Sequence, residues 1–396
     1  MASSLSITLN SRGATFGEDV AFLQKHTDVI VLRDTKGHAK VAIVPAWQGR
    51  VMTSSAQGDE GSSFGWINRE LIDSGKLLPH MNAFGGEDRF WLGPEGGQFS
   101  IFFAPGAQFG LANWYVPPAF DTLPFQSLSH NHSHAAFSSE FAVTNYSGTR
   151  FEVRVDRRIN LLASGTAWHR LGLHSKRDVH LVAYESDNRI VNAGRNPWAK
   201  DTGLLSIWIL GMFTPAPNAT IAVPIQPGPE SELGARVTSD YFGAVPPERL
   251  KVTGSAVFLS GDGKYRSKIG INPKRSKGVL GAYDADNQVL TIVQFDQPKG
   301  VTEYVNSLWK LQGNPYGGDV ANSYNDGPPS PGAKPLGPFF EMESSSPAAA
   351  LAPGASMEHI HRTLHLSGPE GSLDAVSRAV LGLSLGEIKS ALPANR

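Results

Sequence analysis

The sequence predicts an all-β fold, with a large antiparallel sandwich trimmed by a few short helices. Three observations support this fold class. Apolar and polar residues alternate with a period of two in many segments, which is the pattern of half-buried strands. Helical patterns are few and lie near the two ends of the chain. The 396 residues include 42 Gly and 27 Pro with only 18% charged residues, a composition that suits many short strands joined by turns.

The predicted strands follow one another along most of the chain. Alternation indicates strands at residues 29–33, 40–45, 99–103, 137–143, 150–159, 180–185, 204–210, 251–259, 289–295 and 303–311. No repeat of fixed period is present, which favours a sandwich over a propeller. The Gly- and Pro-rich stretch 325–338 lies between strand candidates and is predicted to form a long loop, a kind of segment that often carries function.

Helices are predicted at both ends of the chain. Residues 16–24 follow an N-cap at Thr15, and residues 66–73 form a short amphipathic segment. Two short helices are expected at about 372–392, the first of them ending at Gly382.

Composition excludes several classes of function. The formal net charge of −1 argues against a nucleic-acid partner or an anionic membrane surface, and the basic run at 268–277 is expected to be a solvated loop. No run of about 18 apolar residues occurs, so no membrane span is predicted. The absence of Cys excludes disulfides, thiolate nucleophiles and Cys-ligated zinc. The chain start has no leader pattern, so the compartment is cytoplasmic, or periplasmic or extracellular if a signal peptide was removed.

The last two predicted strands carry an unusual set of ionisable residues. Glu341 and Glu343 are two residues apart, so an extended backbone places both carboxylates on one face. His359, His361 and His365 share a face of the following strand in the same way. Such a face is a poor core and suits acid/base or metal chemistry, although an exposed hairpin with a solvated polar face is the structural alternative.

These two strands are expected to pair as a hairpin. Pro and Gly residues within 347–354 favour an antiparallel return between them. A turn at the centre of this connection would place Glu341 opposite His359, with both side chains on the same side of the sheet.

A second cluster occupies residues 80–91. His80 precedes a pair of glycines, and Glu87, Asp88, Arg89 and Trp91 follow them. Carboxylates with an arginine can bind several hydroxyls, and a tryptophan offers an apolar face to a sugar ring. The structural alternative is a turn braced by a buried Asp–Arg pair.

A third cluster lies near residue 325. Tyr324, Asn325 and Asp326 supply donors and acceptors that suit a polyhydroxyl ligand, and Trp309 supplies a second stacking face. The same oxygens suit Ca²⁺ less well because their spacing does not match an EF-hand, and a plain Asn-Asp-Gly turn remains an alternative.

The closing segment also resembles a known family. Glu341-Met-Glu343, Pro347 and Leu351-Ala-Pro353-Gly354 resemble the closing hairpin of the galactose mutarotase-like superfamily, which includes the aldose 1-epimerases. The resemblance places Glu341 close to the catalytic base of those epimerases. Segments 85–91 and 322–326 look like an uncharacterised bacterial domain-of-unknown-function family within the superfamily, over nearly the whole chain.

The resemblance implies one domain over residues 1–396, with the fold of that superfamily. This fold is a large antiparallel two-sheet supersandwich with a few short peripheral helices and a carbohydrate-sized cleft on one sheet. It supports epimerases, lyase domains and glycosidase accessory domains, so it does not determine the reaction. The early Asn and Arg and the mid-chain His of the aldose epimerases have no identified counterpart here.

We therefore expect a carbohydrate ligand and acid/base chemistry, with no cofactor. Glu341 or Glu343 would act as the base, and His359 or His361 as the acid or the orienting group. Two alternatives stay open at this point. The protein binds saccharide without turnover, or Glu341, His359 and His361 hold a divalent metal that activates a sugar hydroxyl or water.

Overall fold

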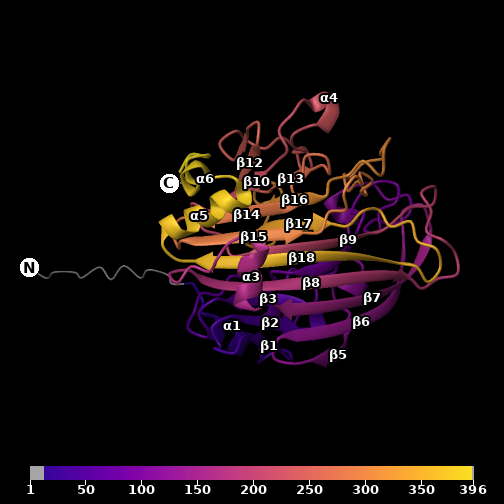
Figure 1. The fold of residues 1–396 in the computed structure, drawn as a ribbon. Helices are drawn as coiled ribbons and strands as arrows, with labels where there is room; N and C mark the ends of the chain where they lie inside the picture. The colour runs from indigo at the N-terminus through magenta and orange to yellow at the C-terminus, as the bar shows by residue number, and fades with distance from the viewer. Residues whose placement is uncertain (1–12, 395–396) are drawn as a thin grey trace, which may run out of the picture.

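The computed structural model describes residues 13–394 and shows a protein made mostly of antiparallel sheets (Figure 1). A ten-stranded and a five-stranded sheet form the two main layers, and a smaller three-stranded sheet adjoins them. The large two-sheet architecture confirms the predicted all-β class, while the small third sheet was not predicted. The first residues, on which the leader argument depends, lie outside the described part of the chain.

The ten-stranded sheet forms the larger layer. In spatial order it contains β11 (Leu250–Val252), β12 (Ala256–Ser260), β10 (Thr220–Pro224), β14 (Val279–Asp284), β15 (Val289–Phe295), β18 (Ser356–Ser367), β8 (His180–Asn192), β7 (Arg150–Leu161), β6 (His134–Thr144) and β5 (Gln126–His130).

The five-stranded sheet forms the opposing layer and carries the candidate site. Its spatial order is β13 (Ser267–Ile271), β16 (Ala321–Asn325), β17 (Phe340–Ser345), β9 (Ser206–Phe213) and β4 (Arg89–Gly93). The small sheet contains β1 (Ile30–Arg33), β2 (Lys40–Val44) and β3 (Arg50–Ser55).

Helices are short and peripheral. They are α1 (Phe16–Leu23), α2 (Arg69–Ser74), α3 (Ser164–Arg170), α4 (Glu230–Leu233), α5 (Glu370–Leu381) and α6 (Leu385–Lys389). The 3₁₀ turns are η1 (Pro45–Trp47), η2 (Leu111–Asn113) and η3 (Pro118–Phe120). Thr15 caps α1 through a capping box, as its sequence predicts, and Gly382 ends α5 in a left-handed conformation. Within the described chain no helix is long and apolar enough to cross a membrane.

Two predicted strands are absent. Residues 99–103 and 303–311 contain alternating apolar residues but form irregular segments with isolated bridges at Phe103 and Tyr304. Their aromatic side chains pack against one another instead, since Phe103 makes an edge contact with Trp309 at 5.2 Å between ring centroids. Alternation alone cannot distinguish this packing from a strand, because strand formation also requires a hydrogen-bonding edge.

The last two strands do not form the predicted hairpin. β17 pairs with β16 and β9 in the five-stranded sheet, whereas β18 pairs with β15 and β8 in the ten-stranded sheet. The connection at 346–355 therefore crosses from one layer to the other. Glu341 consequently does not lie opposite His359 in a ladder, and this expectation is wrong.

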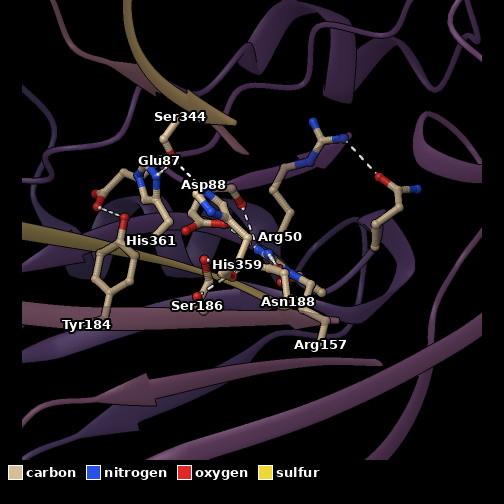
Figure 2. Close-up of polar contacts among 12 residues, drawn as sticks. Arg50, Glu87, Asp88, Arg157, Tyr184, Ser186, Asn188, Ser344, His359 and His361 are labelled. Atoms are coloured by element: carbon tan, nitrogen blue, oxygen red, sulfur yellow. Dashed lines mark hydrogen bonds and ion pairs between the residues drawn. The ribbon is translucent and has the colours of Figure 1, made fainter. Parts of the chain in front are cut away.

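The histidine face of β18 was expected to be a poor core, but it is the face that points into the sandwich. Leu364 and Leu366 point away from the sandwich and pack with Leu373 and Leu381 of the C-terminal helix α5. The histidine face points inward, toward the five-stranded sheet (Figure 2). The apolar face of β18 points outward because helix α5 packs against it there and buries it.

The inward histidines join the two layers through one hydroxyl. Ser344 of β17 places its Oγ 2.7 Å from His359 Nε2 and 2.8 Å from His361 Nδ1 (Figure 2). Burial lowers the pKa of His359 to about 3 and that of His361 to about 4, so both rings are neutral near pH 7. A neutral pair satisfies the geometry, because the hydroxyl donates to one ring nitrogen and accepts from the other.

Charged residues extend these polar contacts between the two sheets. Arg157 of β7 donates to Asp88 Oδ1 at 2.5 Å and to Asn188 Oδ1 at 2.5 Å. Glu87 accepts from the Tyr184 hydroxyl at 2.9 Å (Figure 2). The Oε2 atom of Glu87 also lies 3.1 Å from His365 Nε2. These groups are buried and paired, so they stabilise the relative position of the sheets.

Replacing Ser344 by Ala should destabilise the protein. The change leaves two buried ring nitrogens without their hydroxyl partner, so we expect a loss of about 1–3 kcal/mol in the free energy of unfolding. Urea denaturation measures this loss, with Ser330→Ala in the exposed 327–338 loop as the control. Equal stability of the two variants would contradict this role of Ser344.

Candidate functional site

The outer face of the five-stranded sheet collects side chains from four adjacent strands. Residues directly opposite each other in antiparallel strands point to the same face. Lys268 pairs with Tyr324, Tyr324 with Glu341, and Glu341 with Met212. These four residues thus form one row across the sheet.

A second row runs parallel to the first. Glu343 pairs with Leu210, and Leu210 pairs with Arg89 on β4. Trp208 and Trp91 form the next pair, with their ring centroids 5.6 Å apart in an edge contact. Carboxylates, cations and indoles are therefore interleaved on one face.

This face is the floor of a cleft with about 820 Å³ of empty space, part of it open to solvent. Seven aromatic side chains line the cleft, namely Trp91, Trp114, Trp208, Phe242, Trp309, Tyr324 and Phe339. The ionisable residues that line it are Arg89, Glu95, Arg266, Lys268, Asp326, Lys334 and Glu341.

Glu341 and Arg89 form a buried ion pair on the floor of this cleft. Arg89 Nη2 donates to Glu341 Oε1, and its guanidinium lies 5.0 Å from the centre of the Trp91 ring. Burial raises the pKa of Glu341 to about 8 against the lowering influence of Arg89, and the nearby carboxylate of Glu343 adds to the rise. A carboxyl in this range exchanges protons near neutral pH.

Lys268 lies among the carboxyl groups of the floor. Its Nζ is 3.2 Å from Glu343 Oε2 and 3.9 Å from Glu95 Oε2, and the Trp208 indole donates to Glu343 Oε2 at 2.8 Å. Burial lowers the pKa of Lys268, but the carboxylates of Glu343 and Glu95 outweigh it and the net shift is upward. Burial also raises the pKa of Glu95. The floor thus holds a cation fixed between acidic groups.

Several buried donors of the cleft residues have no hydrogen-bond partner within the described chain. They are Nε of Arg89 and the indole Nε1 of Trp91 and of Trp114. Buried donors are normally paired, so unpaired ones are unusual and mark places where a bound water or ligand supplies the partner.

The 327–338 loop closes one side of the cleft. The Tyr324 hydroxyl donates to Asp326 Oδ1 at 2.7 Å, and Asp326 Oδ2 accepts from the Gly337 amide at 2.8 Å. These two bonds fix both ends of the loop at the end of β16. The predicted long loop is therefore part of the cleft wall.

The structure brings together part of the predicted site. Six of the proposed residues line the cleft, namely Arg89, Trp91, Trp309, Tyr324, Asp326 and Glu341. Glu343 lies on the same face, buried beneath the cleft.

The other predicted binding residues lie outside the cleft. His80 supports a wall from behind, since its Nδ1 is 2.7 Å from the Trp114 carbonyl oxygen. Asn325 donates to Asp262 Oδ1 at 3.2 Å and braces a neighbouring turn. Glu87 and Asp88 lie between the sheets, and Asp88 forms the Asp–Arg brace that was the structural alternative, with Arg157 as its partner.

The proposed catalytic histidines are on the wrong side of β17. Side chains alternate along a strand, so Glu341 faces the cleft while Ser344 and the rings of His359 and His361 that it binds lie between the sheets. The metal set of Glu341, His359 and His361 therefore does not converge. Among residues 13–394 no cluster of three or more His, Asp or Glu residues is arranged to hold a metal ion.

Sequence reasoning missed three floor residues. Lys268 was assigned to a solvated basic run, but its partner Glu343 is 75 positions away and cannot be seen locally. Arg275 of the same run is also buried, where it donates to backbone carbonyls such as that of Gly234. Trp208 lies in a fully apolar strand pattern, and Glu95 follows a Gly-Pro turn; neither pattern carries a functional signal.

The chain belongs to a protein family. The model of a family of unknown function (DUF6786) matches residues 14–392. No curated protein sequence is significantly similar to this chain.

Solved structures with a related arrangement of strands include three bacterial proteins. Slr1438 from Synechocystis sp. PCC 6803 is 13% identical, with 87% of this chain and 96% of that chain covered and a TM-score of 0.49. A putative aldose 1-epimerase from Escherichia coli K12 is 13% identical (86% and 99% covered, TM-score 0.47). A galactose mutarotase-like protein from Lactobacillus casei ATCC 334 is 10% identical (86% and 100% covered, TM-score 0.49). These similarities agree with the predicted resemblance.

The buried carboxyl of Glu341 predicts a specific dependence of stability on pH. Its folded-state pKa is raised, so the folded protein binds the proton more tightly than the unfolded chain, and stability is lost as pH rises from about 5 to about 8. In Glu341→Gln this component disappears. The Tm of the variant relative to wild type should therefore increase with pH, by up to about 1.4 kcal/mol per pH unit when expressed as free energy.

Glu358→Gln on the exposed side of β18 is the matched control for this measurement. Only the slope with pH is compared, because the substitution also alters the contact with Arg89 and so adds an offset to the stability of Glu341→Gln that is not the proton-linked component. A Tm difference that is constant with pH, or equal to that of the control, would contradict the raised pKa.

Proposed function

We propose that this protein binds a saccharide in the cleft and that Glu341 performs acid/base chemistry on it. The observation that carries the proposal is a buried carboxyl of raised pKa on the floor of an aromatic-walled cleft. Indole faces suit the C–H surface of a sugar ring, while the ionisable floor suits its hydroxyls. Perturbed carboxyls in a cleft are typical of functional sites.

The floor offers two carboxyl groups for proton transfer. Glu341 would exchange a proton with a sugar hydroxyl or ring oxygen, since its pKa lies close to neutral. Glu95 lines the same cleft and its pKa is raised by burial, so it would take the partner role that was predicted for His359 or His361. Lys268, fixed near Glu95, would stabilise negative charge that develops on oxygen. The chemistry is compatible with epimerase-, lyase- or hydrolase-type reactions.

A non-catalytic saccharide-binding role is the second candidate. The observation that favours it is the ion pair between Glu341 and Arg89, which holds the carboxyl in place and occupies one of its oxygens. In that case the polar floor would serve recognition alone.

Glu341→Gln separates the two candidates. The amide keeps the size of the side chain but cannot exchange a proton, so we expect turnover of the preferred sugar to fall by at least about a hundredfold while the sugar still binds. The measurements are turnover on a panel of free sugars and glycosides, and binding followed by tryptophan fluorescence, because four Trp residues line the cleft.

Glu358→Gln is again the control, and it should retain wild-type turnover. Binding without turnover in wild type would favour the non-catalytic candidate. If neither binding nor turnover is found for any sugar in the panel, the proposed function is wrong.

A further inference from the structure

We infer that the saccharide taken by this cleft carries an anionic group, a carboxylate or a phosphate, which Arg266 and Lys334 bind. The inference rests on the proposed function and names the class of its substrate. It depends on which cations in the cleft already have an acidic partner and which have none.

Two of the four cations that line the cleft already have an acidic partner within the protein. Arg89 is ion-paired to Glu341. Lys268 lies 3.2 Å from Glu343 and 3.9 Å from Glu95, so its charge is balanced by two carboxylates. Neither cation is free to attract an anionic ligand, because withdrawing it would leave a buried charge unpaired.

Arg266 differs from these two cations. It immediately precedes β13, is half-buried, and its guanidinium lies 3.6 Å from the centre of the Phe242 ring, which fixes it over a cleft wall. Within residues 13–394 it forms no ion pair with a carboxylate. Asp326 and Glu95 both experience its positive charge, but neither forms an ion pair with it, and the Asp326 oxygens already accept from the Tyr324 hydroxyl and the Gly337 amide. Tyr324 also lies within hydrogen-bonding reach of Arg266.

Lys334 supplies a second cation that lines the cleft. It is exposed, lines the cleft from the 327–338 loop, and forms no ion pair with any residue that the structure describes. The loop contains no Asp or Glu, so Lys334 is its sole charged residue. A guanidinium stacked on a cleft wall and an ammonium on a long, flexible stem are a suitable pair for one anionic group, because the stem can bring the ammonium to the bound anion.

The chemistry of these side chains selects a planar or tetrahedral oxyanion. An arginine binds carboxylate or phosphate through two parallel N–H donors, and a lysine adds a point charge. With the anion at the loop and the sugar ring against the aromatic walls, the rest of the ligand would reach Glu341 on the floor. A uronic acid and a sugar phosphate both meet this description.

Matched ligands test the inference in wild-type protein. Affinity is measured for glucose, glucuronate and glucose 6-phosphate, and for galactose, galacturonate and galactose 6-phosphate. We expect the best anionic sugar to bind about tenfold or more tightly than its neutral counterpart. Its affinity should fall between 50 and 500 mM NaCl while that of the neutral sugar does not. Comparison of the uronates with the sugar phosphates shows whether the anionic group is a carboxylate or a phosphate.

Arg266→Gln should remove most of this preference. We expect about a tenfold loss for the anionic sugar and less than about a twofold change for the neutral one. Lys264→Gln is the matched control, because Lys264 is exposed nearby but does not line the cleft. If Arg266→Gln does not fold, the salt dependence in wild type still tests the inference.

The outcomes separate this inference from the proposed function. Equal affinity for neutral and anionic sugars, without salt dependence, overturns the inference and leaves the saccharide site standing. If Arg266→Gln loses affinity equally for neutral and anionic sugars, the inference is likewise overturned and the saccharide site stands. Binding of no sugar of either kind overturns the proposed function and the inference with it.

Discussion

The structure depends on the fact that β17 is buried on both of its faces. Its side chains alternate, so Glu341 and Glu343 enter the cleft side while Ser344 enters the space between the sheets. A one-residue slip of this strand would exchange the two sets and bury carboxylates beside His359 and His361. The hydroxyl bridge to the histidines and the ion pair to Arg89 therefore specify the same register from opposite sides.

Charge compensation explains how so polar a floor is tolerated. Buried charges are costly unless they are paired, and here Arg89 pairs with Glu341 and Lys268 with Glu343. Each pair joins strands that are not adjacent or are distant in sequence, so the geometry is set by the sheet before any ligand enters. Such preorganised charges stabilise developing charge without rearrangement. Arg266 is distinct because no carboxylate of residues 13–394 forms an ion pair with it, so its charge stays available to a ligand at the Phe242 wall of the cleft.

Sequence patterns predicted the strand-rich class and the shared face of Glu341 and Glu343, because a period of two is a local property. They failed where partners are remote. The turn-rich connection predicted a hairpin, but β17 and β18 pair with strands of different sheets. The even spacing of the histidines shows that they share a face of β18, but it does not show whether that face is buried. Lys268 belonged to a basic run that normally stays in water, and only its approach to Glu343 shows that it is buried. Local patterns carry no information on such pairs.

We propose that saccharide binds on the outer face of the five-stranded sheet, over Glu341, while the inter-sheet histidines are structural. The decisive measurement is a crystal structure of the Glu341→Gln variant with a bound sugar. We predict a sugar ring against the indoles of Trp91 or Trp309, with a hydroxyl within hydrogen-bond distance of residue 341. A sugar bound instead in the separate pocket beside Phe64 and His365, with the cleft empty, would contradict the account.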